Sequence, residues 1–153
     1  MSKTGSWIGI IKVPIRVPTS QKAIGKVGIC QMKEWPDFVK DLTGPLRNLR
    51  GGAPEVMKAF ADIAQAALSG KALDSKTKEL IALAISVAVR CDDCIAFHVK
   101  AAVEQGASRD EIGEVLGMAI YMGAGPSAMY ASHAFEAYSQ FEARKAARPA
   151  PSA

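Results

Sequence analysis

The chain has 153 residues and a mass of 16.2 kDa, and 49% of its residues are hydrophobic but only 7% are aromatic. This length suits one domain whose core is built from small and aliphatic side chains. The formal net charge is +4, but residues 1–31 carry five lysines or arginines and no acid, so the remainder sums to 4 − 5 = −1. A nearly neutral domain argues against a phosphate-tracking surface, and we expect no nucleic-acid partner.

The basic segment 1–31 is predicted to be a poorly ordered extension of the domain, with a targeting role as the alternative. Its apolar run over residues 7–15 is interrupted by Lys12 and Pro14. That run is far shorter than the roughly 20 apolar residues of a membrane helix, so no membrane partner is expected. Cys30 lies in this segment and is expected to take no part in the chemistry.

Residues 32–147 read as one helical domain, in which Gly, Pro and Ser separate the helices. Pro36 is expected to begin a helix that ends before Gly44 and Pro45, and a second short element should end at Gly51 and Gly52. The longer predicted helices cover residues 54–68, 76–89, 92–105, 110–122 and 126–146. No alternating strand pattern competes with these helices, so the predicted fold class is all-α. Residues 148–153 are predicted to be a disordered tail.

Two of these helices carry further information. Ser108 and Glu111 have the spacing of a capping box at the start of the helix over 110–122. The helix over 76–89 is apolar nearly all round, which indicates a central position. A small helical chain with such a helix often completes its burial by self-association, so we expect a homo-oligomer.

The chemistry-bearing residues are Cys91, Cys94 and His98, with Glu79 upstream in an apolar run. Two thiols, an imidazole and a carboxylate are the components of a redox-active dithiol site, because a base held by an acid can generate the thiolate. Three cysteines are an odd number, and two of them share a CxxC, which argues against a structural disulfide framework. We therefore expect the protein to reside in a reducing compartment, and we predict a cytoplasmic location.

The spacing of these residues makes a geometric prediction. In one continuous helix Glu79 and His98 would lie about 28 Å apart, at about 1.5 Å rise per residue. If the chain instead turns over near residues 88–91, an antiparallel hairpin places Glu79 opposite His98, and both thiols lie at the start of the second helix. Cys94 and His98 then share a helical face. In that hairpin Glu79 orients His98 and His98 takes the proton of Cys94.

Which thiol attacks first stays open. Cys94 is closer to the base, whereas Cys91 at the mouth of the helix is better placed to meet a bulky partner. Asp92 and Asp93 lie between the thiols and oppose thiolate formation, although acids at a helix start also gain from the helix dipole.

A metal site is the main alternative reading of the CxxC. Zinc usually takes four protein ligands in structural sites, and this stretch supplies three, with Cys30 or His133 as the fourth. Haem attachment through CxxCH is excluded because Ile95 follows the second cysteine. His133 is otherwise interpreted as a packed or surface histidine. We therefore predict no metal and no cofactor.

The arrangement of Glu79, Cys91, Cys94 and His98, written Ex11CxxCxxxH, resembles the alkylhydroperoxidase AhpD-like core of the carboxymuconolactone decarboxylase family. Residues 73–98 and 101–135 are similar to that family as well, and the resemblance covers roughly residues 53–142. It implies trimers or hexamers and thiol-dependent reduction of hydroperoxides, with a lipoyl or other dithiol protein as electron donor. The better-studied peroxidases have a histidine directly before the second cysteine, where this chain has Asp93.

The predicted function is therefore that of a thiol-disulfide oxidoreductase, a peroxidase that acts on alkyl or hydrogen peroxides through Cys91 and Cys94. A decarboxylase like the family's namesake is one alternative, but that chemistry needs no cysteine pair. A noncatalytic oligomeric protein that binds a metal or a ligand is the other.

Overall fold

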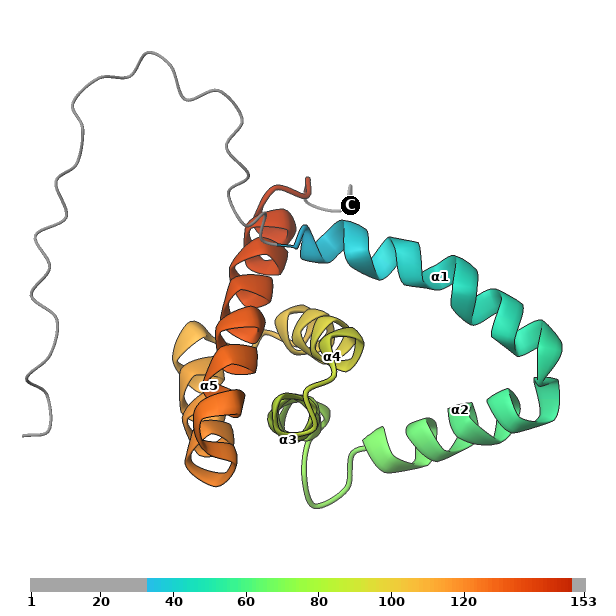
Figure 1. The fold of residues 1–153 in the computed structure, drawn as a ribbon, viewed down its shortest axis with the longest axis horizontal. Helices are drawn as coiled ribbons and strands as arrows, with labels where there is room; N and C mark the ends of the chain where they lie inside the picture. Colours follow the sequence, from blue (N-terminus) through green and yellow to red (C-terminus); the bar gives the residue numbers. More distant parts are fainter. Residues whose placement is uncertain (1–32, 150–153) are drawn as a thin grey trace, which may run out of the picture. The chain divides into compact units, whose positions relative to one another are not determined.

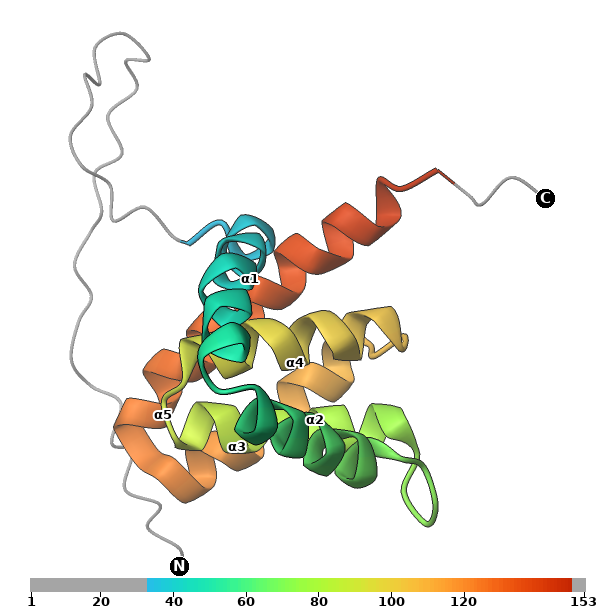
Figure 2. The same ribbon diagram turned by 90° about the vertical axis from the view of Figure 1, so that its right-hand side faces the viewer.

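The computed structural model describes residues 33–149, which form five helices and no strand (Figures 1 and 2). The predicted all-α class is confirmed. Residues 1–32 and 150–153 lie outside the described part, and so do the predictions for the basic extension, for Cys30 and for most of the tail.

Three helices form the core of the domain. They are α3 (Ser75–Ala88), α4 (Asp92–Glu104) and α5 (Arg109–Ala146), and each packs against the other two. In Figure 1 α3 and α4 lie side by side and are seen nearly end on, with α5 beside them. The apolar side chains between them are fully buried, and they include Leu83, Val87, Ile95, Val99 and Ile112. This packing fixes the α3–α4 hairpin that carries the motif.

Helix α3 has the predicted central position, but only one of its faces is covered. Leu83 and Val87 have no exposed surface, whereas Ile81 and Ile85 are 45% and 57% exposed. Since these side chains are equally apolar, the sequence pattern alone does not tell the covered face from the exposed one. A stripe of isoleucine therefore remains on the outside of α3.

Helix α5 contains the break expected around residues 123–125. Ala124 has a left-handed backbone (φ 52°, ψ −147°), and Pro126 follows it. Figure 1 shows the two halves of α5 turning back on each other at this point. Gly123 permits the turn, because a Cβ there would lie 1.9 Å from the Oγ of buried Ser127. The predicted capping box is also present at the start of α5, where Glu111 N–H donates to Ser108 Oγ and Ser108 N–H donates to Glu111 Oε2.

The prediction for the first helix was wrong. Helix α1 runs without interruption from Trp35 to Gly52, through Gly44 and Pro45. Pro45 removes one backbone donor, and the carbonyl it leaves lies on an exposed stretch of helix where water can satisfy it. The buried ring of Trp35 anchors the beginning of α1, and the backbone N–H of Trp35 donates to Gln140 Oε1 of α5 (2.8 Å).

Helix α2 (Pro54–Leu68) matches its predicted bounds, and none of its residues is buried. Helix α1 leads the chain away from α3, α4 and α5, and α2 returns it to α3 (Figure 1). Val56, Phe60 and Ile63 are each more than 60% exposed. No helix within residues 33–149 is long and apolar enough to cross a membrane.

Candidate active site

A tight turn between α3 and α4 brings the motif together. Arg90 has a left-handed backbone (φ 61°), Arg90 N–H donates to Val87 O (3.2 Å), and Cys91 N–H donates to Ser86 O (3.0 Å). These two bonds are those of a Schellman motif, which ends a helix and reverses the chain. The predicted turn over 88–91 is therefore present, and Cys91 becomes the N-cap of α4.

The two thiols lie at the first turn of α4. Cys91 and Cys94 are joined by a disulfide, with their Cα atoms 5.3 Å apart, and both residues are half-buried. The Cys94 backbone N–H points at Cys91 Sγ (3.2 Å), so the sulfur occupies the place that an N-cap oxygen usually takes. Unpaired amides and the positive end of the helix dipole stabilise a thiolate at this position.

Glu79 and His98 lie opposite each other across the hairpin. His98 Nδ1 is 2.7 Å from Glu79 Oε2, and Glu79 is only 5% exposed although it is an acid. When Glu79 is ionised its carboxylate can only accept, so Nδ1 carries the proton and Nε2 is left as the basic nitrogen. His98 follows Cys94 by one helical turn. The structure therefore brings together all four residues of the motif on two adjacent helices.

A second histidine–carboxylate pair lies at the same end of α4. His133 Nδ1, from the second half of α5, is 3.0 Å from Asp92 Oδ1, and the Lys33 ammonium binds Asp92 Oδ2. Burial alone would raise the pKa of Asp92, but hydrogen bonds from Lys33 and His133, together with their charges, hold it below its usual value. The side chain of Asp92 is therefore anchored as an anion next to Cys91.

This second pair was not predicted from the sequence. The sequence favours a packed or surface position for His133, and for Asp92 it indicates a charge that opposes the thiolate and also gains from the helix dipole. The two residues are 41 positions apart, and no local spacing connects them. Because Lys33 and His133 face Asp92, its negative charge is largely offset, whereas Asp93 is exposed. The one local signal in the sequence is that His133 follows Tyr130 by three residues, which places the two side chains on the same face of a helix.

Within residues 33–149, no three or more His, Cys, Asp or Glu side chains gather closely enough to hold a metal ion. Of the two candidate fourth ligands, His133 is engaged with Asp92, and Cys30 lies outside the described residues.

Comparisons of the sequence and of the fold with known proteins point to the same family. The sequence profile of the carboxymuconolactone decarboxylase family matches residues 54–137. A crystal structure of a carboxymuconolactone decarboxylase family protein from Legionella pneumophila is 49% identical, with a TM-score of 0.69, and the match covers 71% of this chain and 97% of that one. The chain belongs to the carboxymuconolactone decarboxylase family.

Two further relatives extend this comparison of the family. A Thermotoga maritima family member of known structure is 29% identical with a TM-score of 0.62, over 69% of this chain and 93% of that one. An uncharacterized protein of Haemophilus influenzae is 38% identical over 106 residues, which is 69% of this chain and 94% of that one. The carboxymuconolactone decarboxylase family includes enzymes, both decarboxylases and peroxidases.

Proposed function

We propose that this protein is a thiol-disulfide oxidoreductase that reduces alkyl or hydrogen peroxides through Cys91 and Cys94. The observation that carries this assignment is the buried Glu79 carboxylate, hydrogen-bonded to His98 at 2.7 Å, one helical turn from a cysteine at a helix start. A carboxylate is seldom buried unless a partner needs its charge, and this partner is a base next to a thiol. Further support comes from the Thermotoga relative, for which a role in the antioxidative response has been suggested.

The proposed reaction begins with the reduced pair. His98 Nε2 accepts the proton of the Cys94 thiol, and the thiolate attacks the outer oxygen of the hydroperoxide. The O–O bond breaks, the leaving alkoxide takes the proton from His98 as an alcohol, and Cys94 becomes a sulfenic acid. The Cys91 thiol then attacks the sulfur of the Cys94 sulfenic acid. This step releases water and forms the Cys91–Cys94 disulfide seen in the structure.

An external dithiol closes the cycle. It reduces the Cys91–Cys94 disulfide and is itself oxidised to a disulfide, so the net reaction converts one hydroperoxide and one donor dithiol to alcohol, water and donor disulfide. We propose a lipoyl group or another protein dithiol as this donor. Such a cycle works where thiols are kept reduced, so the proposal includes a cytoplasmic location.

The experiment follows tert-butyl hydroperoxide consumption with dihydrolipoamide as donor. Replacing Cys94 or Cys91 by serine should abolish turnover. Cys91→Ser should still consume one equivalent of peroxide and leave a sulfenic acid that dimedone traps, whereas Cys94→Ser should not. Cys30→Ser is the matched control, because it removes a thiol outside the motif, and it should be as active as the wild type. Equal rates for the wild type and Cys94→Ser would show that the assignment is wrong.

We also propose that the chain assembles into trimers or hexamers. Helix α2 buries none of its residues within the single chain, and Phe60 and Ile63 are 63% and 67% exposed. Ile85 on α3 is 57% exposed as well, and large exposed apolar side chains of this kind are what a subunit interface would cover. Light scattering after gel filtration should give three or six chains for the wild type. Phe60→Ser should dissociate the assembly, whereas Lys58→Gln on the same helix should not.

A further inference from the structure

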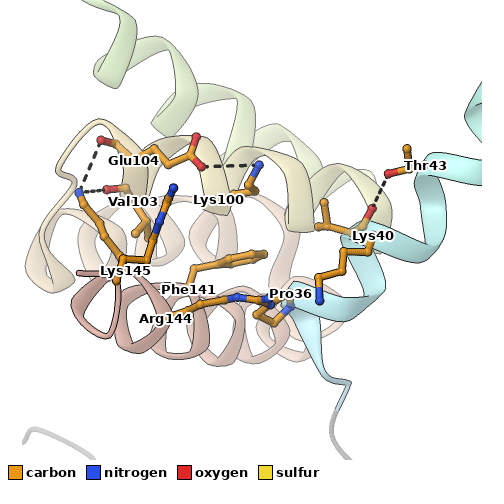
Figure 3. Close-up of a pocket in the computed structure, with 11 residues that line it drawn as sticks. Pro36, Lys40, Thr43, Lys100, Val103, Glu104, Phe141, Arg144 and Lys145 are labelled. Carbon is orange, nitrogen blue, oxygen red and sulfur yellow. Dashed lines mark hydrogen bonds and ion pairs between the residues drawn. The ribbon is translucent and has the colours of Figure 1, made fainter. Parts of the chain in front are cut away.

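A concave site lies at the opposite end of α4 from the cysteines. It is a groove of about 650 Å³ between the first turns of α1, the last turns of α4 and the end of α5. We call it the cationic groove. Val39, Val103 and Phe141 form its apolar floor, and Phe141 lies in the middle of the site in Figure 3. This volume is in the range of small-molecule sites, about 300 to 1,000 Å³.

The rim of the groove concentrates positive charge. Five cationic side chains and one carboxylate line it, and they are Lys40, Lys100, Arg144, Lys145, Arg148 and Glu104. Residues 32–153 carry a net charge of −1 in total, so this accumulation does not follow from the overall composition. An apolar floor under a positive rim matches a ligand that has an apolar body and a negative head.

The intramolecular partners of these cations differ in how tightly they hold them. The Lys145 ammonium donates to Val103 O at 2.6 Å and thereby satisfies a carbonyl at the end of α4. By contrast, Lys100–Glu104 and Arg144–Asp37 are long ion pairs, at 3.5 and 3.6 Å, and their side chains are half exposed. Such pairs contribute little, so a ligand carboxylate can replace them. Arg144 also offers a planar fork that binds carboxylates with two parallel hydrogen bonds.

The groove does not open toward the redox site. At about 100° per residue, Lys100, Val103 and Glu104 lie between about 120° and 160° round the α4 axis from His98. A ligand in the groove therefore leaves the Glu79–His98 face of the helix uncovered. The segment 1–31 is an unsuitable occupant, because its five cations and absence of acids give it the same sign of charge as the rim.

We propose that the cationic groove binds a small amphipathic carboxylate of the fatty-acid type, with the carboxylate between Lys100 and Arg144 and the hydrocarbon chain over Phe141. This is a binding function separate from the dithiol chemistry. A charged head paired with the rim and an apolar chain on the floor each supply part of the affinity.

The test is calorimetric titration of the full chain with decanoate. One decanoate should bind per chain, and octanoate should bind roughly tenfold more weakly because it buries two fewer methylene groups. Arg144→Gln and Lys100→Gln should each weaken decanoate binding by about tenfold or more. Lys58→Gln is the matched control, since Lys58 forms an exposed ion pair with Asp62 on α2 (2.8 Å) and does not line the groove. Cys94→Ser should bind decanoate as the wild type does, which separates this site from the peroxidase assignment.

Two control ligands test the contributions of the carboxylate and of the hydrocarbon chain separately. Acetate has the carboxylate alone and decyltrimethylammonium has the chain with a positive head, and neither should bind appreciably. Equal binding of decanoate and decyltrimethylammonium, equal effects of Arg144→Gln and Lys58→Gln, or absence of decanoate binding would each overturn the inference. So would a short oligonucleotide that bound through Arg144 and Lys100 while decanoate did not, because the rim would then be a phosphate-binding surface.

Discussion

The two histidine–carboxylate pairs that involve α4 have similar distances but different surroundings. His98 and Glu79 meet at 2.7 Å across the hairpin, and His133 and Asp92 meet at 3.0 Å between α4 and α5. Glu79 is 5% exposed and has no lysine or arginine within ion-pair distance among the described residues, whereas Asp92 also binds Lys33. A carboxylate with one partner concentrates its effect on that partner, and a carboxylate shared by a lysine and a histidine mainly holds both side chains in place.

The two pairs therefore differ in what they do for the neighbouring cysteine. In the reaction proposed above, the Glu79 carboxylate orients His98, and His98 accepts the proton of Cys94. The Asp92 carboxylate ties the start of α4 to Lys33 and to α5, and its own charge is offset. We assign reactivity to the first pair and local stability to the second.

The largest expected difference is in the rate of peroxide reduction. Glu79→Gln keeps the size of the side chain but removes its charge, so it should lower kcat/KM for tert-butyl hydroperoxide by about 100-fold, within the range usual for general-base catalysis. Asp92→Asn should lower it by less than about tenfold. The same order should appear in the rate at which iodoacetamide alkylates the reduced protein, because alkylation needs the thiolate. If Asp92→Asn slowed both reactions as much as Glu79→Gln, the division of roles would be wrong.

The next largest effect is expected at the turn within α5, which brings His133 to Asp92. Gly123→Ala places a Cβ 1.9 Å from Ser127 Oγ, so the second half of α5 must shift, at a cost of about 1–3 kcal/mol in the free energy of unfolding. The shift should separate His133 from Asp92 and leave Glu79 and His98 in place. Urea unfolding measures the cost, and NMR of the two histidine side chains shows which pair is disturbed.

Gly125→Ala is the matched control, because a Cβ there meets no atom within 4 Å. It should be neutral or slightly stabilising, since alanine loses less backbone freedom than glycine on folding. Equal destabilisation by both substitutions would mean that the contact with Ser127 is not the reason for glycine at position 123.

The smallest effect is a pH-dependent one. The pKa of Asp92 is lowered in the fold, so its contribution to stability is present above its unfolded value near 3.8 and is lost as the pH falls through the lower folded value. Asp92→Asn should therefore cost about 1 kcal/mol at pH 7 and progressively less below pH 4. Urea unfolding at several pH values measures this difference. Asp93→Asn, next to it but exposed, should cost about 0.5 kcal/mol or less at each pH. A pH-independent loss in Asp92→Asn would point to packing rather than charge.

The sequence was sufficient for the first pair because its geometry is local. One short turn separates α3 from α4, so the positions of Glu79 and His98 follow from the helical rise and the place of the turn. The break in α5 was also readable, from Gly123, Gly125 and Pro126. The capping box and the bounds of α2 depend on a few neighbouring residues and were predicted for the same reason.

The second pair and the first helix needed tertiary information. Asp92 and His133 meet only because two helices pack side by side, and their separation of 41 residues leaves no periodic signal. The continuity of α1 through Gly44 and Pro45 depends on what surrounds the helix. Where the backbone is exposed, water can replace the one intrahelical hydrogen bond that proline removes. The exposed face of α3 could not be predicted either, since isoleucine and leucine alternate round it.

The reversal at Ala124 also determines how far the chain can reach. As one straight rod the 38 residues of α5 would extend about 57 Å, and His133 would lie about 36 Å from Arg109, well beyond the roughly 20 Å length of α4. A single left-handed residue folds that rod in two and returns its distal half to the place where α4 begins. Asp92, the residue after Cys91, thereby contacts both Lys33, just before α1, and His133, in the second half of α5.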